Sequence, residues 1–168
     1  IRSTIIPNTA RNTILPILSD KLSELKFGLC VAPEFLREGN ALDDFMNPDK
    51  IVIGSSDKNS IIFVKKIFQN FKDKCEFIET SLESAELIKY TNNAFFSMLI
   101  SFSNEIANIT EKIPGVDSHE ILKALVSDKR ITSIANNERI VPSLESYLIP
   151  GCGFGGSCFP KDVQAILD

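Results

Sequence analysis

The pattern of apolar residues changes near residue 81, and this change constrains the fold more than any other feature of the chain. Before it, short runs rich in β-branched and apolar residues alternate with amphipathic stretches. Strands that alternate with helices predict a mainly parallel sheet with crossover helices. About four strands amount to half of a doubly wound α/β domain, so we expect a partial sheet of this kind. The predicted strands are 3–7, 27–32, 50–55 and 75–79.

Capping and turn residues place helices between these strands. Asn8 or Thr9 can cap a first helix, whose early turns Pro16 is expected to disturb because proline lacks the N–H that a helix needs. A short helix is expected over 39–45, and Asp57 opens a third with apolar residues at helical spacing.

The second part of the chain predicts one helix from Leu82 to about Lys112. Ser81 caps this helix, and Glu83 and Glu86 lie in its first turns, where the helix dipole favours them. Its apolar positions cover more of the circumference than one core-facing stripe needs. A helix buried within its own domain and a helix that pairs two subunits both fit this pattern. The apolar positions include Leu87, Phe95, Met98, Leu99, Phe102, Ile106 and Ile109.

Shorter elements follow this long helix. Helices are expected over 118–126 and 131–139, and a loop rich in glycine and proline then runs to Cys158. The predicted fold class is therefore α/β, with a partial doubly wound, Rossmann-like sheet followed by an all-α region that contains one long helix.

Composition excludes several partners. Of 168 residues, 43% are hydrophobic, and 18 basic and 22 acidic side chains give a formal charge of −4. Scattered positive charges form no footprint for nucleic acid or an anionic membrane surface. No apolar run approaches the ~20 residues that cross a bilayer, and nothing marks secretion, so a cytoplasmic protein is expected. Because the chain opens on Ile1 inside a strand-like run, we expect it to be a piece of a longer protein.

The chain has few cysteine and histidine side chains that could bind a metal ion. Cys30, Cys75, Cys152 and Cys158 form no C-x-x-C pair, and His119 is the single histidine. Neither a metal site nor a disulfide scaffold is therefore expected. A structural or solvent role is assigned to His119, because no serine or cysteine hydrolase arrangement involves it convincingly.

One apparent dinucleotide motif is rejected. Gly151, Gly153 and Gly156 satisfy G-x-G-x-x-G, but Pro150 precedes them and too few residues follow to supply an acidic ribose ligand. We expect these glycines to let backbone amides approach a ligand or a neighbouring chain.

Cys158 is the strongest candidate for chemistry. Pro160 suits the first turn of a helix, which would place Cys158 at or just before the helix N-terminus. Backbone N–H groups there favour the thiolate, and Lys161 would add to the effect. A nucleophile is favoured over a small buried structural cysteine, because Gly155 and Gly156 leave room for a substrate. A structural role is favoured for the other three cysteines.

Other polar side chains could assist this thiol. Asp162 lies one helical turn after Cys158. Lys89 and Asn93 share one face of the long helix, where a cation and an amide can bind an oxyanion. A solvated surface position explains Asp162 equally well and the other two more plainly.

Charged residues also surround the ends of the predicted strands and helices. Glu34 and Glu38 follow the carboxyl end of a strand, where open α/β sheets bind ligands and where paired carboxylates suit acid–base chemistry. Arg37 and Arg130 could hold phosphate, although ion pairs with nearby acids are the plainer expectation.

Five segments together resemble successive signatures of the UDP-glucose/GDP-mannose dehydrogenase family. They span the chain in family order, at 3–7, 32–39, 86–95, 128–131 and 153–162. The resemblance implies that residues 1–80 are the C-terminal part of an NAD-binding domain. It also implies that 81–168 are a helical central domain, truncated at its C-terminal end, and that the long helix over 82–112 pairs two subunits into a homodimer.

The resemblance further implies an oxidation of a nucleotide-linked hexose at C6, from alcohol to carboxylate, by two hydride transfers to NAD. Catalytic roles would fall to Cys158, Lys89, Asn93, Asp162 and Glu34. Cofactor contacts would come from Ser3, Thr4, Glu38 and Lys161. Substrate contacts would come from Phe35, Leu36, Arg130, Tyr147, Gly153 and Phe154.

Alternatives to this interpretation stay open. The run Cys-Phe-Pro-Lys-Asp favours a glucose or mannose substrate, and general similarity favours UDP-glucose over GDP-mannose. A non-catalytic helical dimerisation module with an inert Cys158, and a thiol-dependent dehydrogenase of free aldehydes, are competing functions. By itself this chain is expected to be inactive, because the remaining parts of both nucleotide pockets are not in it.

Overall fold

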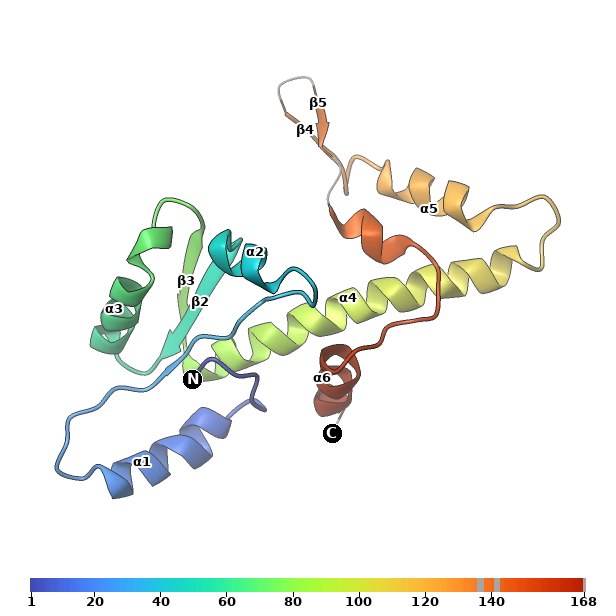
Figure 1. Cartoon of the computed structure of the whole chain (residues 1–168). Helices are drawn as coiled ribbons and strands as arrows, with labels where there is room; N and C mark the ends of the chain where they lie inside the picture. The colour runs from blue at the N-terminus through green and yellow to red at the C-terminus, as the bar shows by residue number, and fades with distance from the viewer. Residues whose placement is uncertain (136–137, 141–142, 168) are drawn as a thin grey trace. The chain divides into compact units, whose positions relative to one another are not determined.

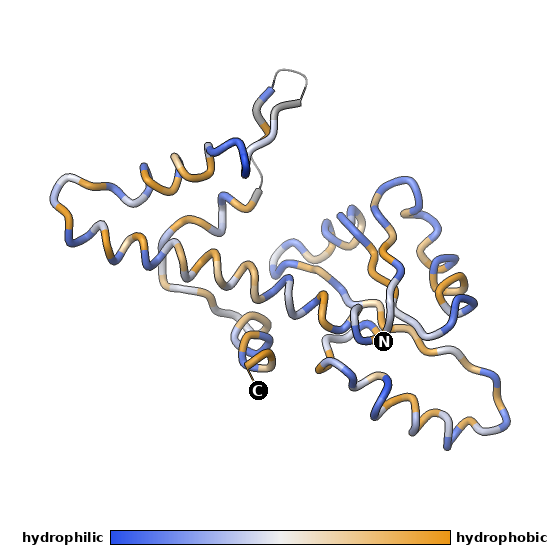
Figure 2. Tube along the Cα trace, turned by 180° about the vertical axis from the view of Figure 1, so that it is seen from behind, coloured by the Kyte–Doolittle hydropathy of each residue, from blue (hydrophilic) through white to orange (hydrophobic). Residues whose placement is uncertain are grey.

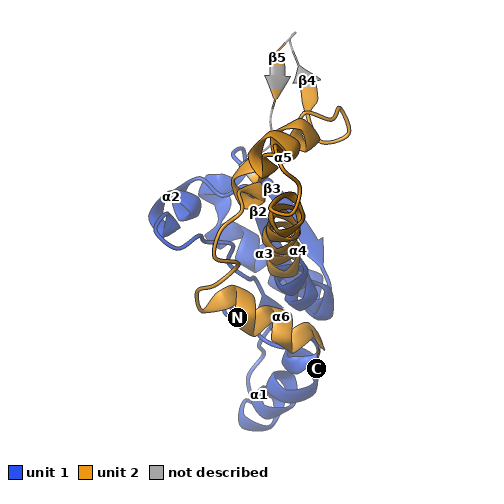
Figure 3. Ribbon diagram, turned by 90° about the vertical axis from the view of Figure 1, so that its right-hand side faces the viewer, with its two compact units in different colours: residues 1–91 blue, residues 92–168 orange. Residues whose placement is uncertain are grey.

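The computed structural model describes residues 1–135, 138–140 and 143–167. It forms two compact units, Ile1–Thr91 and Asn92–Asp168, which Figure 3 colours separately. The longest helix, α4 (Leu82–Thr110), contributes residues to both.

The first unit is built on a three-stranded sheet with the order β1-β2-β3. β2 pairs antiparallel with β1 and parallel with β3, which lies beside it in Figure 1. Helices connect the strands, so the predicted partial α/β sheet is confirmed. The elements before α4 are η1 (Ala10–Ile14), α1 (Leu15–Lys21), β1 (Cys30–Val31), α2 (Ala41–Met46), β2 (Lys50–Ser55), α3 (Lys58–Ile67), η2 (Gln69–Phe71) and β3 (Glu76–Thr80).

The predicted strand over 3–7 is wrong, and the sheet is less parallel than expected. Only Ile1 pairs with its neighbour, since its amino group donates to the Cys30 carbonyl at 2.7 Å and its carbonyl accepts from Ala32 N at 2.8 Å. The chain then turns, because Pro7 has no N–H for a ladder and Asn8 adopts a left-handed φ of 72°.

β2 is buried on both faces. Val52 packs in one apolar cluster that includes residues of α1 and α4, whereas Ile51 and Ile53 pack in a second cluster against α3. This alternation follows from the two-residue period of a strand, and Figure 2 shows the apolar colour along it. At Gly54 a Cβ would lie 2.3 Å from the Ser81 carbonyl oxygen, so only glycine allows this approach of β2 to the start of α4.

Two local helix signals were interpreted correctly. The Asp57 carboxylate caps α3 by accepting from Ser60 N at 2.9 Å. The first helix is irregular as predicted, since a π-helical segment, η1, precedes α1 and Pro16 lies in the first turn of α1. Proline cannot supply the next helical N–H, which accounts for the wider turn before it.

The second unit contains most of α4 and a set of short elements. α5 is confirmed with the predicted bounds, and the Asp117 carboxylate caps it by accepting from His119 N at 2.9 Å. The elements after α4 are α5 (Ser118–Val126), β4 (Ser133–Ala135), β5 (Glu138–Ile140), η3 (Ser143–Leu148) and α6 (Cys158–Leu167).

The predicted helix over 131–139 is wrong, because β4 and β5 form an antiparallel pair there. Thr132 is buried, and its hydroxyl donates to the Val126 carbonyl at the end of α5. This bond commits the β-branched Thr132 to a turn, and the chain leaves the helical conformation.

α4 ends at Thr110, close to the expected Lys112, but its faces are unusual. Polar side chains occupy most of its buried positions, beside the buried Leu82, Ala85 and Tyr90, whereas several large apolar side chains are exposed. The buried polar residues are Glu86, Lys89, Asn93, Ser97, Ser103 and Thr110, and the exposed apolar residues are Leu87, Phe95, Met98, Phe102 and Ile109. Neither α4 nor any other helix in the described part of the chain combines the length and hydropathy of a membrane span.

Candidate active site

The structure places Cys158 where the sequence predicted, at the first residue of α6, with Pro160 in the first turn. The residue is exposed, and its Sγ lies 3.7 Å from the Ser157 hydroxyl oxygen. Gly156 has a φ of 76°, and a Cβ on Gly155 would meet no atom within 4 Å. The chain before the sulfur is therefore uncrowded at Gly155.

One turn further along α6, Asp162 is fully buried and not solvated. Asn93 Nδ2 donates to its Oδ2 at 2.6 Å, and Lys161 Nζ pairs with its Oδ1. Because Asn93 is itself 4% exposed, this is a buried amide–carboxylate contact that holds α6 to α4. The sequence predicted neither the burial nor the pairing of these two residues.

Lys89 is also buried, at 4% exposure, although an exposed face was the plainer expectation. Its Nζ lies 3.5 Å from Glu34 Oε1 and 5.4 Å from the centre of the Phe35 ring. The Lys50 ammonium lies 4.5 Å from the same ring centre. The first unit therefore brings a buried cation, a carboxylate and a cation–π contact together after β1.

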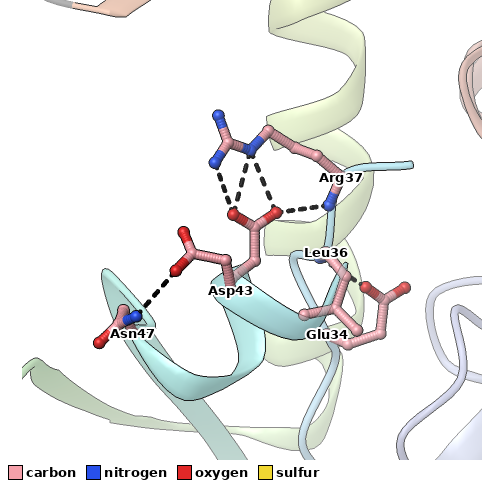
Figure 4. Close-up of polar contacts among 6 residues, drawn as sticks. Glu34, Leu36, Arg37, Asp43 and Asn47 are labelled. Carbon is pink, nitrogen blue, oxygen red and sulfur yellow. Dashed lines mark hydrogen bonds and ion pairs between the residues drawn. The ribbon is translucent and has the colours of Figure 1, made fainter. Parts of the chain in front are cut away.

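The segment from Glu34 to Arg37 is ordered by one hydrogen bond within it and by the contacts of Arg37 with Asp44 (Figure 4). Glu34 Oε2 accepts from Leu36 N at 2.7 Å. The Arg37 guanidinium and backbone N–H both bind Asp44, and the guanidinium lowers the pKa of that carboxyl. A second polar contact in the same view joins Asn47 to Asp43. Arg37 thus forms an ion pair with a nearby acid, which was the plainer of the two expectations for it.

Arg130 forms a two-point contact of the same kind. Its Nε and Nη2 donate to the two Asp128 carboxylate oxygens at 3.0 and 2.8 Å. These hydrogen bonds lower the pKa of Asp128 to about 2. The Arg130 side chain is nevertheless 85% exposed, so it is presented to solvent in a fixed orientation.

The loop before α6 is attached to α4. The Tyr147 ring packs on Phe96 with centroids 4.4 Å apart, and Gly151 N donates to Asn104 Oδ1 at 2.8 Å. Phe154 is half-buried, and Gly153 adopts a φ of 92° that favours glycine. The sequence pattern did not identify Asn104 as the residue that binds this loop, since nothing in its position on the helix distinguishes it.

The remaining candidates differ in their exposure to solvent. Ser3 and Glu38 are exposed and Thr4 is half-buried. His119 is exposed, with Nδ1 3.5 Å from Asp117 Oδ1, in line with a solvent role. Burial raises the pKa values of the Cys30 and Cys75 thiols, which suits the structural role favoured for them.

Glu86 is the most prominent residue that the sequence did not mark for a site. It is 2% exposed and accepts hydrogen bonds from two backbone N–H groups, those of Asn8 and Ala10. The signal that could have found it is its spacing, because Glu86 lies three residues before Lys89 and therefore shares its helix face.

Comparison with known proteins gives consistent matches. A family model for the UDP-glucose/GDP-mannose dehydrogenase family, central domain, matches residues 83–168, and the model for the NAD binding domain of that family matches residues 1–72. The chain is 43% identical over 167 residues to UDP-glucose 6-dehydrogenase of Rickettsia bellii. It is 37% identical over 169 residues to GDP-mannose 6-dehydrogenase of Pseudomonas putida.

A solved structure agrees with these matches. A UDP-glucose dehydrogenase from the hyperthermophilic archaeon Pyrobaculum islandicum aligns with a TM-score of 0.84 at 35% identity. Each of the three alignments covers 99% of this chain but only 35% or 36% of the relative, so the chain spans about a third of their length. The two family models match in order and leave only residues 73–82 between them, and the chain therefore belongs to the UDP-glucose/GDP-mannose dehydrogenase family.

Proposed function

We propose that this chain is part of an NAD-dependent dehydrogenase that oxidises C6 of a nucleotide-linked hexose from alcohol to carboxylate. The observation that carries the proposal is the exposed Cys158 at the start of α6, one turn before a buried Asp162 that is bound to Asn93. An exposed thiol at a helix N-terminus suits a nucleophile. A buried amide–carboxylate pair beside it suits the positioning of a reacting group.

The first oxidation converts the alcohol to an aldehyde and releases one proton and one hydride. NAD, when bound, supplies the hydride acceptor for this step and for the later one. Lys89 and Asn93 stabilise the oxygen as negative charge develops on it, because donors aimed at a developing oxyanion lower the barrier.

The second oxidation requires the thiol. The Cys158 thiolate adds to the aldehyde carbon, and the carbonyl oxygen takes up a proton to give a thiohemiacetal. Loss of the hydroxyl proton and of a second hydride then leaves a thioester. Water then attacks the thioester, breaks the carbon–sulfur bond and releases the carboxylate and the free thiol. Glu34 removes a proton from that water, and Asp162 orients the water or Lys89.

The cofactor contacts are assigned to Ser3, Thr4, Glu38 and Lys161. The Ser3 and Thr4 hydroxyls and the Glu38 carboxylate have no hydrogen bond or ion pair to any residue that the structure describes. Such polar groups fit the hydroxyls of a ribose and the amide of a nicotinamide. The match of residues 1–72 to an NAD binding domain supports this assignment.

The substrate contacts are assigned to Phe35, Leu36, Arg130, Tyr147, Gly153 and Phe154. UDP-glucose is the proposed substrate and UDP-glucuronate the product. Identities of 43% and 40% to two UDP-glucose 6-dehydrogenases, against 37% to a GDP-mannose 6-dehydrogenase, support that choice. GDP-mannose is the second candidate because those proteins match along the same length of the chain.

A homodimer through the α4 helix is also proposed. The exposed Phe95, Met98 and Phe102 follow helical spacing along α4. A contiguous apolar patch of this kind marks a protein interface. The exposed and oriented Arg130 is proposed to reach the site of the neighbouring subunit.

The test is NAD reduction by the intact protein with a panel of nucleotide sugars. We expect two NAD molecules to be reduced for each UDP-glucose, and we expect Cys158→Ala to abolish the release of UDP-glucuronate. Full activity of Cys158→Ala, or no turnover of any nucleotide sugar, would contradict the proposal. Oxidation of simple aldehydes alone would instead identify a thiol-dependent aldehyde dehydrogenase.

A further inference from the structure

Glu86 is a buried carboxylate that the proposed reaction does not use. Its Oε2 accepts from Asn8 N at 2.6 Å, and its Oε1 accepts from Ala10 N at 2.8 Å. The partners lie 78 and 76 residues away in the sequence, so these bonds join two distant segments of the first unit. A buried carboxylate is costly unless hydrogen bonds satisfy it, and here each oxygen has one backbone donor.

The two N–H groups lie where the chain needs an acceptor. Ala10 begins the π segment η1, whose first N–H groups have no carbonyl partner within the helix. Asn8 holds a left-handed φ of 72°, a conformation that is unfavourable for a residue with a Cβ and persists only where its surroundings impose it. Glu86 therefore both caps the irregular helix and fixes the turn before it.

The segments joined in this way carry proposed reaction residues at both ends. Thr4 lies four residues before Asn8, on the stretch that enters the turn. Lys89 lies three residues after Glu86, on the next turn of α4. Between them, Ile5 packs against the cluster that contains Leu82 and Ala85, so the apolar packing supports the same connection.

We propose that Glu86 is a positioning residue that sets the distance between the cofactor-contacting segment Ser3–Thr4 and the helix that carries Lys89. This inference rests on the proposed function, because it needs Thr4 to contact NAD. Glu86 itself touches neither substrate nor cofactor in this scheme. It acts through the backbone of Asn8 and Ala10.

The arrangement is specific for a carboxylate. Two donors face the side chain, so it must offer two acceptors at once. Glutamine offers one oxygen and places an N–H₂ group against the second donor. Aspartate keeps both acceptors but is one methylene shorter, so it should restore the contact in part.

The test compares Glu86→Gln, Glu86→Asp and Glu83→Gln in the intact enzyme. Glu83 is the matched control because it lies on the same end of α4 but binds the Arg11 side chain at the surface. With Glu86→Gln we expect amide hydrogen exchange in residues 8–10 to accelerate at least about tenfold, since each bond to a charged acceptor protects its N–H. We expect the KM for NAD to rise about tenfold, as the loss of one such bond implies. The KM for the nucleotide sugar should change less than about twofold.

Glu86→Asp should show smaller changes of the same kind, and Glu83→Gln should leave both KM values and the exchange at residues 8–10 unchanged. Unchanged exchange or an unchanged KM for NAD in Glu86→Gln would overturn this inference while the wild-type activity stands. Equal rises in both KM values would overturn it too, because a general loss of structure gives that result. If Glu86→Gln does not fold, Glu86→Asp decides by the same measurements. A wild-type enzyme that reduces no NAD with any nucleotide sugar would overturn the proposed function instead.

Discussion

The two faces of α4 differ, and beyond its first turn the difference is largely opposite to that of an ordinary surface helix. The buried face carries Glu86, Lys89 and Asn93, whereas the exposed face carries Phe95, Met98 and Phe102. An amphipathic helix normally buries its apolar stripe. Burial of polar groups is therefore used here to hold specific partners, namely backbone N–H groups, Glu34 and Asp162.

The two faces of α4 also differ in the contacts that they make. The polar face is satisfied within the chain, because no buried side-chain nitrogen or oxygen in the described residues lacks a hydrogen-bond partner. The apolar face keeps large side chains in solvent, with Met98 at 55% and Ile109 at 53% exposure. Contacts inside the chain account for the polar face, and the apolar face is the one proposed to pair two subunits.

The largest effect is expected on the polar face. Lys89→Met should lower kcat about 100- to 1000-fold in the intact enzyme, because removal of an oxyanion donor has consequences of that size. The matched control is Lys112→Met, which removes an exposed lysine just beyond the end of α4. Steady-state NAD reduction measures both variants, and a loss below about threefold in Lys89→Met would contradict the assigned role.

The next effect is expected on the apolar face. Met98→Asp should weaken homodimer formation at least about 100-fold, because a charge would be buried without a partner. Asn59→Asp adds the same charge at an exposed position of another helix, α3, and should have little effect. Sedimentation velocity over a range of concentrations separates the two, and an unchanged dimer in Met98→Asp would show that this face is not the interface.

A smaller effect is expected on stability. Asp162→Asn should lower the free energy of unfolding by about 1–3 kcal/mol, because the new amide directs a donor at Lys161 in a buried site. Glu79→Gln removes the acid of the exposed Lys65–Glu79 pair and should cost less than about 1 kcal/mol. Urea unfolding followed by circular dichroism measures both, and equal costs would contradict the difference between buried and surface pairs.

The smallest effect concerns pH and the first turn of α4. The hydrogen bond from Arg11 lowers the pKa of Glu83 from 4.5 to about 2. Because the pKa of Glu83 is lower in the folded than in the unfolded chain, the ionised carboxylate stabilises the folded state at pH values above the unfolded-state pKa. This contribution is lost as the pH falls from about 4.5 towards 2. The melting temperature of Glu83→Gln should therefore depend less steeply on pH in this window. Parallel curves for the two proteins would exclude the pair as a source of acid sensitivity.

Much of the first unit could be predicted from local patterns. The bounds of β2 and the start of α3 were predicted, because a buried strand is largely apolar and Asp57 is a strong cap. The strand over 3–7 and the helix over 131–139 failed for a different reason. Hydrogen bonds that no periodicity encodes decide those segments: Ile1 pairs with Cys30 across 29 residues, and the Thr132 hydroxyl binds the Val126 carbonyl six residues back.

The candidate site likewise has features that local sequence signals predict and features that they do not. The position of Cys158 at a helix start followed from Pro160, a local signal. The burial of Lys89, Asn93 and Asp162 could not be deduced, because an i, i+4 spacing defines a face but not what covers it. Glu86 was not identified for the same reason, since a glutamate near the start of a helix is normally exposed to solvent and stabilised there by the helix dipole.

Gly54 has a consequence for a residue that it does not touch. A methyl group there would meet the carbonyl oxygen of Ser81, just before α4, at 2.3 Å and the Ala85 side chain in the first turns of α4 at 2.5 Å. An added side chain would push the helix away from the sheet, and the Lys89 ammonium would move with it. The distance between that ammonium and Glu34 thus depends on the lack of a Cβ at residue 54. A substitution in the strand could therefore abolish activity without changing any residue that takes part in the reaction.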